Sequence, residues 1–391
     1  MARSSLLVPS LVLAPALVIS AALLSRAGPL DPPPGPVASS YKTLTSVEPR
    51  TEINSTNTPG DLDSIYRITV PGAYYLSGNV VGNPGRAGIE ISASGVTVDL
   101  NGFTMTGVAG SLSAIRCNSL TKGVQISNGT ISAWGASGVD VTSALEVQIR
   151  SIVSFNNGAN GIVTAGNVLI ESCVANGNTA EGIFVSGLNA IVRSCVAHNN
   201  SSNGIHHAGA GNIIDCLSTG NAGNGFLASG AVTITNCQTW GNISSGFDVV
   251  NCSIINCNAQ SNSADGFHSN GATTFSGCQS LGNSGDGFEV TARSSVIHCS
   301  SQGNNIGIHV TGADNRIEAN NIVQNINKGI RADIAGSVFV RNQASGNGGF
   351  NYDLVAGNIG LFVSAISSGA VSGSAGGVPP GSTDPSANFS Y

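Results

Sequence analysis

The chain has 391 residues, enough for two or three ordinary domains or for one long repetitive one. It holds 52 glycines and only 9% charged residues, so amphipathic helices, which need Glu, Lys, Arg and Leu at a 3.6-residue period, are not expected. The net charge is −6 and only 15 residues are Lys or Arg, which excludes an electrostatic nucleic-acid binder. The composition indicates a chain built mostly of β-strands and turns.

The N-terminal residues 1–27 have the pattern of a secretory signal peptide. A basic start precedes an apolar run over residues 6–24, and a small-residue site ends at Ala27. The length of the run leaves an uncleaved membrane anchor as the alternative, although Pro9 and Pro15 interrupt it. Because the sequence has no second such run, we expect an exported protein whose mature chain has no transmembrane segment.

Residues 28–60 include three consecutive prolines and are predicted to be a Pro-rich leader or N-terminal cap. Alternating segments follow, such as YRITVPGAYYLSGNV at 66–80 and GIEISASGVTVDLNGF at 88–103. They predict short strands and tight turns, as in the first coils of a solenoid. A cap is expected there because the end of a solenoid exposes unpaired strand edges.

The sequence then repeats every 20–22 residues, in four kinds of position. A Gly followed by Ile or Phe stands at 161, 182, 204, 225, 246, 266, 287, 307 and 329. An Asn stands at 157, 178, 200, 221, 242, 262, 283, 304 and 325. A Cys stands at 173, 195, 216, 237, 257, 278 and 299, after which Asn320 and Asn342 occupy the position. An Ile, Val or Phe stands three residues before each of these.

This period predicts an all-β fold, a single right-handed parallel β-helix with about 21 residues per coil. Leucine-rich repeats need a Leu framework and ankyrin repeats need helices, and the sequence has neither. Equivalent residues of successive coils are expected to stack about 4.8 Å apart. The Ile and Phe that follow the repeat Gly then form an inward column.

The Asn and Cys positions are predicted to be structural. Asn tolerates left-handed backbone geometry, and stacked amides can bond one another, which indicates a ladder of turns. The Cys side chains are expected to be buried, mostly reduced thiols, because stacked residues with parallel Cβ vectors do not reach disulfide geometry. Beyond the repeats, residues 356–391 are predicted to be a Gly/Ser/Pro-rich C-terminal tail.

The segments GNSGDGFEV, AEGIFV and NGIVTAGNVLIESCVANGN resemble right-handed parallel β-helix repeat proteins of the pectin-lyase-like superfamily, exported bacterial members in particular. The resemblance covers residues 61–355. It implies either a secreted polysaccharide lyase, hydrolase or epimerase, or an adhesin without enzymatic activity. The Asn-Thr-Asp, Gly-His-Gly and Arg-Ile-Lys motifs of polygalacturonase-like members are missing. No catalytic residue is therefore assigned from the resemblance.

A position two residues after the repeat Gly is predicted to point outward and varies strongly. Its occupants are Val163, Phe184, His206, Leu227, Asp248, His268, Glu289, His309 and Arg331. A neighbouring position brings Asp265 and Asp286 beside His268 and Glu289. Such carboxylates and imidazoles suit general acid and base catalysis. The catalytic candidates are Asp248, Asp265, His268, Asp286, Glu289 and His309.

The same row offers binding residues. Arg331 is a candidate for ligand binding, and Asp265, Asp286 and Glu289 are candidates for a Ca²⁺ site, with no other cofactor expected. Charges of alternating sign on stacked strands also stabilise a sheet without any ligand, so a purely structural row is the alternative. The aromatic residues considered as sugar platforms are Trp134 and Trp240, together with Tyr74 and Tyr75.

Two functions remain open from the sequence. One is a non-catalytic surface or envelope scaffold or adhesin that contacts polysaccharide or cell-envelope components. The other is a polysaccharide lyase or glycoside hydrolase that uses the outward Asp, His and Glu. The constant 20–22-residue gaps leave no room for the long loops that wall a catalytic groove, which favours the scaffold. The sequence does not indicate an oligomeric state.

Overall fold

The computed structural model describes residues 47–364 and 384–391. Residues Arg50–Tyr391 form one compact unit, which is described here. The predicted signal peptide, the start of the predicted leader and the middle of the predicted tail lie outside the described residues. Within the described ranges, no helix is long and apolar enough to cross a membrane.

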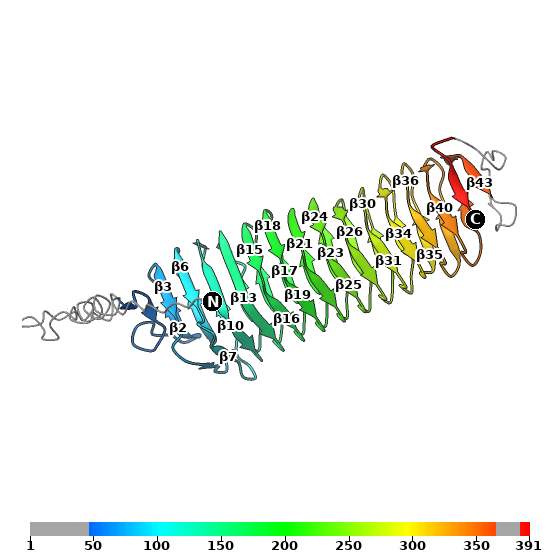
Figure 1. Ribbon diagram of the computed structural model, residues 1–391. Helices are drawn as coiled ribbons and strands as arrows, with labels where there is room; N and C mark the ends of the chain where they lie inside the picture. The colour runs from blue at the N-terminus through cyan, green and yellow to red at the C-terminus, as the bar shows by residue number, and fades with distance from the viewer. Residues whose placement is uncertain (1–46, 365–383) are drawn as a thin grey trace, which may run out of the picture. The chain divides into compact units, whose positions relative to one another are not determined.

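Parallel strands stacked along one axis make up the fold (Figure 1). One 14-stranded sheet takes one strand from each successive coil over residues 64–354. Its strands are β2 (Ser64–Ile68), β5 (Ala87–Ile91), β8 (Ile115–Arg116), β11 (Val139–Val141), β14 (Ile162–Thr164), β17 (Ile183–Val185) and β20 (Ile205–His207). The sheet continues with β23 (Phe226–Ser229), β26 (Phe247–Val250), β29 (Phe267–Ser269), β32 (Phe288–Val290), β35 (Ile306–Val310), β38 (Lys328–Ala332) and β41 (Tyr352–Leu354).

A 28-stranded sheet covers the rest of each coil as two ladders joined by β10 (Gln125–Ser132) and β13 (Val147–Phe155). The first ladder adds β1 (Thr51–Glu52), β3 (Gly72–Tyr75), β6 (Val96–Asp99), β15 (Val168–Glu171), β18 (Ala190–Arg193) and β21 (Gly211–Ile214). It continues with β24 (Val232–Thr235), β27 (Ser253–Ile255), β30 (Thr274–Ser276), β33 (Ser295–Ile297), β36 (Arg316–Glu318), β39 (Val338–Val340) and β42 (Ile359–Gly360).

The second ladder adds β4 (Val80–Val81), β7 (Thr104–Thr106), β16 (Val174–Asn176), β19 (Val196–His198), β22 (Leu217–Thr219), β25 (Gln238–Trp240) and β28 (Asn258–Gln260). It continues with β31 (Gln279–Leu281), β34 (Ser300–Gln302), β37 (Asn321–Val323), β40 (Gln343–Ser345), β43 (Phe362–Ser364) and β44 (Asn388–Ser390). A two-stranded sheet pairs β9 (Thr121–Lys122) with β12 (Ala144–Leu145). The predicted β-helix is confirmed.

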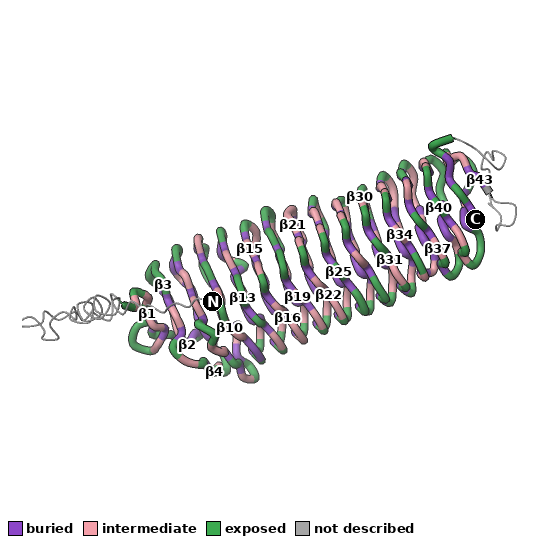
Figure 2. Tube along the Cα trace, in the orientation of Figure 1, coloured by how far each residue is buried: buried purple, intermediate pink, exposed green. Residues whose placement is uncertain are grey.

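The core consists of equivalent side chains stacked along the axis. Each coil accordingly contains buried segments (Figure 2). Ile162 pairs in register with Ile183, and both are fully buried. Further along, the rings of Phe247 and Phe267 stack with centroids 4.8 Å apart and an interplanar angle of 5°. This distance is the spacing of neighbouring strands, so each coil extends the same apolar column.

The Asn column is an interior hydrogen-bonded ladder. Asn221 donates its backbone N–H and its Nδ2 to Oδ1 of Asn242, both at 2.9 Å, and the same two bonds recur between the other members of the column. Asn178, Asn221 and Asn242 have no exposed surface. The predicted amide ladder is confirmed, but the left-handed backbone was assigned to the wrong position. The residue just before the ladder Asn adopts it, as Asn199 does with φ 55°.

The repeat Gly is required by close packing rather than by its backbone conformation. A Cβ on Gly204 would lie 1.9 Å from Ser218 Oγ and 2.6 Å from Asn221 Nδ2. Any side chain there would displace the Asn ladder. The Gly and Asn positions therefore recur together.

The nine cysteines are buried free thiols. Cys237 accepts the backbone N–H of Cys216 on Sγ at 3.4 Å, and its thiol lies 3.3 Å from Thr235 O. Burial raises the pKa of the Cys252 thiol. Asn342 stands two coils after Cys299 and donates its N–H to Oδ1 of Asn388 at 2.9 Å, so β44 adds one more rung at the C-terminal end.

Candidate functional site

The outward side chains of the 14-stranded sheet form one row, which we call the strip. Pairing in register places one member on each strand. The members are Arg67, Glu90, Arg116, Asp140, Val163, Phe184, His206, Leu227, Asp248, His268, Glu289, His309, Arg331 and Asp353. Four predicted catalytic residues, Asp248, His268, Glu289 and His309, therefore lie on consecutive strands.

The strip has three parts of different chemistry. Its N-terminal part is an ion-pair network, in which buried Glu90 lies 2.6 Å from Arg116 Nη2 and 3.1 Å from Arg67 Nε. Its middle part is apolar apart from His206, whose ring stacks on Phe184 with centroids 4.6 Å apart. Its C-terminal part, from Asp248 to Asp353, carries the acidic and imidazole groups.

Asp265 and Asp286 belong to a second row beside the strip, formed by residues that precede the repeat Gly. Asp265 accepts the backbone N–H of Asp286 on Oδ1 at 2.7 Å, and Asp286 in turn accepts that of Ile306 at 3.1 Å. Asn203 makes the equivalent contact three coils before Asp265, through the N–H of Asn224 at 2.9 Å. Both carboxylates therefore also accept hydrogen bonds from backbone N–H groups of the next coil.

Each histidine of the strip is held by a carboxylate from the preceding coil. The pairs are His206 Nδ1 with Glu181 Oε1 at 2.8 Å, His268 Nδ1 with Asp248 Oδ1 at 3.0 Å, and His309 Nδ1 with Asp286 Oδ2 at 2.7 Å. His309 also contacts Asp333 Oδ2 through Nε2 at 3.0 Å. These carboxylates fix the orientation of the rings.

Two groups in the C-terminal part have shifted pKa values. Burial raises the pKa of Asp265 to about 6, and the charges of Asp286 and Glu289 add to this effect. The hydrogen bond that His268 donates to Asp248 raises the pKa of His268, against the opposing effect of burial. A carboxyl group that holds its proton near neutral pH can act as a general acid.

The predicted Ca²⁺ residues are only partly brought together. Ligand atoms of Asp286, Glu289 and His309 lie within 4.8 Å of one another, and Asp265 is outside that group. Calcium takes six to eight oxygen ligands, whereas this group offers two carboxylates and one imidazole. The cluster suits a cation that accepts nitrogen better than it suits Ca²⁺.

Sequence reasoning missed several partners of the strip. Asp333 accepts a hydrogen bond from Arg331 Nε at 2.6 Å, so the predicted ligand-binding arginine is already paired. Lys328 forms an ion pair with Asp353. Asp353 follows Arg331 by one repeat, so continuing the column would have identified it. Asp333 carried no repeat signal of its own, whereas Glu181 occupies the same repeat position as Asp265 and Asp286, directly before the repeat Gly.

The aromatic residues considered as sugar platforms do not belong to the strip. Trp134 is buried and donates its Nε1–H to Met105 O at 3.1 Å, so it is not a surface platform. Trp240 is 58% exposed but lies on β25 of the second ladder. The outward aromatic residue of the strip is Phe184, which the sequence placed in the column without assigning it a role.

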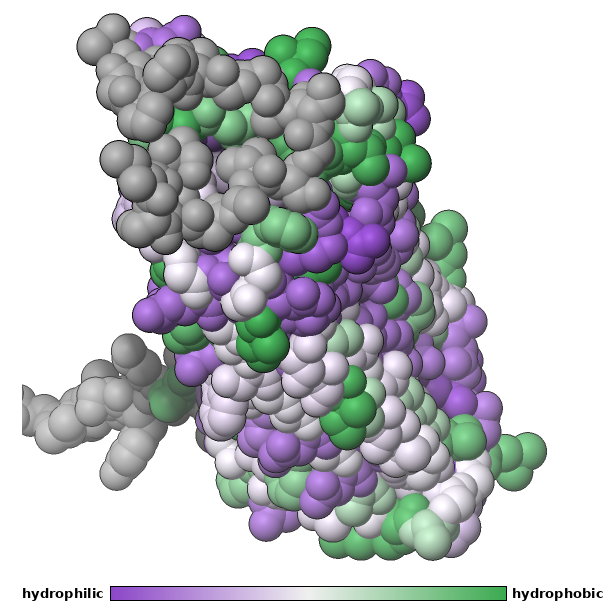
Figure 3. Space-filling view, turned by 90° about the vertical axis from the view of Figure 1, so that its right-hand side faces the viewer, coloured by the Kyte–Doolittle hydropathy of each residue, from purple (hydrophilic) through white to green (hydrophobic). Residues whose placement is uncertain are grey.

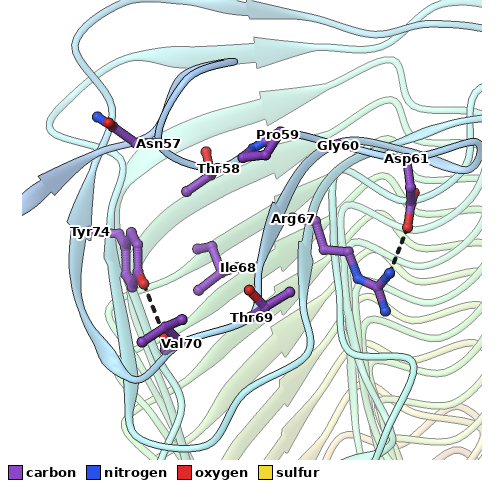
Figure 4. Close-up of a pocket in the computed structure, with 10 residues that line it drawn as sticks. All are labelled: Asn57, Thr58, Pro59, Gly60, Asp61, Arg67, Ile68, Thr69, Val70 and Tyr74. Carbon is purple, nitrogen blue, oxygen red and sulfur yellow. Dashed lines mark hydrogen bonds and ion pairs between the residues drawn. The ribbon is translucent and has the colours of Figure 1, made fainter.

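Two pockets lie away from the C-terminal part of the strip. One, of about 270 Å³, lies between the segments 57–61 and 67–74 near the first coil, where Arg67 pairs with Asp61 and the Tyr74 hydroxyl bonds Val70 O (Figure 4). The other, of about 430 Å³, is an open depression over residues 189–233. None of the predicted catalytic residues lines either pocket.

A family model described as "Right handed beta helix region" matches residues 72–239. The strands described above continue the same coil to residue 354. The chain therefore has the right-handed parallel β-helix fold that the repeats predicted. No curated protein matches the sequence significantly.

Several solved structures are similar to this chain at low sequence identity. The A-module of the mannuronan C-5 epimerase AlgE4 of Azotobacter vinelandii is 16% identical, with a TM-score of 0.47 over 73% of this chain and 87% of that one. The periplasmic alginate epimerase AlgG is 11% identical, with a TM-score of 0.36 over 87% and 80% of the two chains. PfbA, a surface adhesin of Streptococcus pneumoniae, is 10% identical, with a TM-score of 0.37 over 63% and 82%.

Proposed function

We propose that this protein is an exported, non-catalytic β-helix that binds a polysaccharide along the strip. The observation that carries the proposal is the register of the strip, which presents polar side chains on consecutive strands from Asp248 to Asp353. A row with one group about every 4.8 Å suits a linear polymer that repeats its own hydroxyl groups.

The chemistry of the strip favours a neutral polysaccharide. Its C-terminal part and the adjacent second row carry more carboxylates than Lys and Arg side chains, so a polyanion would be repelled. Carboxylates and imidazole nitrogens accept hydrogen bonds from sugar hydroxyls. Phe184 adds an outward, half-buried ring in the middle part, against which the apolar face of a sugar ring can stack.

The open geometry supports binding rather than cleavage. From Val163 to Asp353 successive strip residues are 20–22 positions apart, so the coils carry no long insertions that would wall a groove. The rings of His268 and His309 are also each fixed by a contact between Nδ1 and a carboxylate. On the face seen from the C-terminal end, hydrophilic and hydrophobic residues are interspersed (Figure 3).

A second candidate function is polysaccharide cleavage with Asp265 as the general acid. One observation favours it, the rise of the Asp265 pKa to about 6 beside the carboxylate of Glu289. Glycoside cleavage uses a carboxyl group with a raised pKa as the general acid and a second carboxyl group close to it.

A panel of neutral and uronate-containing polysaccharides, with and without Ca²⁺, tests both functions on the purified full-length chain. We expect retention on a neutral polysaccharide without release of products. The triple variant Asp265→Ala/His268→Ala/Glu289→Ala is expected to lose binding at least tenfold. The control variant Gln238→Ala/Gln260→Ala, which changes outward residues of the second ladder, is expected to bind normally.

Two outcomes would contradict the binding proposal. Failure of the wild-type chain to bind any polysaccharide would exclude it. Product release that disappears in the triple variant but not in the control would instead establish the catalytic function.

A further inference from the structure

We propose that Asp286, Glu289 and His309 form a binding site for a divalent transition-metal cation such as Zn²⁺. Their ligand atoms lie within 4.8 Å of one another. Ligands of one zinc ion, each at about 2.1 Å from the metal, lie at most about 4.2 Å apart, so small side-chain rotations suffice. This inference is independent of polysaccharide binding.

Strand register explains why these three residues meet. Asp286 and Glu289 are three positions apart at the start of one coil, and His309 is the register partner of Glu289 on the next strand. The site therefore needs only two adjacent coils. Asp286 is buried, while the side chains of Glu289 and His309 are half-buried, so a cation can reach them from solvent.

The neighbours of His309 and Asp286 orient both ligands. His309 Nε2 lies 3.0 Å from Asp333 Oδ2, and Asp333 is fixed by Arg331. A ring that donates Nε2–H to a carboxylate has its lone pair on Nδ1, which is the atom that faces Asp286. A carboxylate behind a metal-ligating histidine is the usual outer-shell partner in protein metal sites.

Asp286 is oriented in the same way. Its Oδ1 accepts hydrogen bonds from the Asn305 side chain at 3.0 Å and from the Ile306 backbone at 3.1 Å. Its Oδ2 faces His309 Nδ1 at 2.7 Å. A separation of 2.7 Å is that of a hydrogen bond, so without a metal ion a proton lies between these two atoms, and a metal ion needs them to move slightly apart. The metal would take the place of that proton.

Glu289 supplies the third ligand. Its negative charge is not neutralised by an ion pair with any of the described residues. Among the residues that the structure describes, it has no hydrogen-bond or ion-pair partner, although it lies near Asp265 and Asp286. A divalent cation would neutralise this concentration of carboxylates. One imidazole and two carboxylates suit Zn²⁺, Mn²⁺ or Co²⁺, with water completing the coordination, better than Ca²⁺.

Titration of the full-length chain with Zn²⁺, Co²⁺ and Ca²⁺ by calorimetry at constant pH tests the site, with Co²⁺ absorption as a second readout. We expect one equivalent of Zn²⁺ or Co²⁺ and weaker binding of Ca²⁺. Either Glu289→Gln or His309→Gln should weaken binding at least tenfold. His206→Gln is the matched control, because His206 pairs with Glu181 but belongs to no such cluster.

Several results would overturn the proposal. They are the absence of binding, equal affinity in all three variants, Ca²⁺ binding more tightly than Zn²⁺, and intense thiolate-to-cobalt absorption, which would place the ion on a cysteine. Glu289→Gln removes no described hydrogen bond, so this variant should fold even if His309→Gln does not. Circular dichroism of each variant separates loss of the site from loss of the fold.

Discussion

The inner and outer positions of the same strands follow different rules. On β29, Phe267 and Ser269 point into the core and His268 points outward between them. Inward positions keep their class from coil to coil because each side chain stacks on its equivalents, as Phe267 does on Phe288 at 4.7 Å. Outward positions have no such constraint, so the strip changes from apolar to acidic to imidazole. Information about function is therefore concentrated on the outer face.

The sharpest test of this comparison removes one aromatic ring from an inward position and one from an outward position. Phe267→Ala should lower the free energy of unfolding by about 3–5 kcal/mol, because it leaves a cavity in the stacked core. Phe184→Ala should cost less than about 1 kcal/mol, because that ring is half exposed and contacts His206. Urea denaturation followed by circular dichroism measures both.

Equal losses in the two variants would contradict the comparison. They would mean that the outer ring is as important to the coil as the inner one. Phe267→Leu is a useful control, since it keeps most of the apolar volume and should recover part of the lost stability.

The interior Asn ladder should be nearly as sensitive. Asn221→Ala removes the Oδ1 that accepts from the backbone and side chain of Asn200, and leaves a buried N–H without a partner. We expect a loss of about 2–4 kcal/mol. Asn212→Ala, an outward Asn on β21, should change stability by less than about 0.5 kcal/mol. Thermal unfolding of the two variants compares them directly.

The sequence predicted the inner half of the molecule better than the outer half. Four columns with one period were enough to predict the coil, the inward Ile and Phe and the amide ladder. The left-handed residue was misplaced because Asn199 and Asn200 are adjacent and both fit the rule for Asn in turns. The repeat identifies the side chains that stack on their equivalents in the next coil. This stacking determines the path of the backbone.

The sequence predicted which outward residues stand in register with one another, but it did not predict their side-chain contacts. The column from Asp248 to Arg331 follows from the period alone. The contacts of the strip with Glu181 and Asp333 do not, because contacts between polar side chains depend on rotamers and not on the repeat. Trp134 was taken for a surface residue because it stands before the regular coils, where the period gives no inside and outside.

Histidines on the two sides should respond to pH in opposite directions. Burial lowers the pKa of inward His207, whose Nδ1 accepts the Gly209 N–H, so only the unfolded chain binds its proton readily. The stability that wild type has over His207→Gln should therefore fall as pH drops below about 6.5, the pKa of an unperturbed histidine.

For outward His268 the contribution to stability changes with pH in the opposite direction. Its pKa is raised by Asp248, so its contribution to stability is complete below about pH 6.5 and disappears as pH rises through the pKa of the folded state. The stability that wild type has over His268→Gln should fall with rising pH. Urea denaturation of wild type and both variants across pH 5 to 8 measures the two slopes, and slopes of the same sign would refute the contrast.

The smallest expected effect is that of Asp248→Asn. It should lower the pKa of His268, observed by NMR titration of the ring, and cost less than about 1 kcal/mol of stability, because the pair is partly exposed. Asp215→Asn, an acidic residue outside the strip, should leave that pKa unchanged. If Asp248→Asn instead cost several kcal/mol, the ion pairs of the strip would be part of the architecture. The residues at the variable outer position would then be explained by their contribution to stability, and the argument for a ligand along the strip would lose its physical basis.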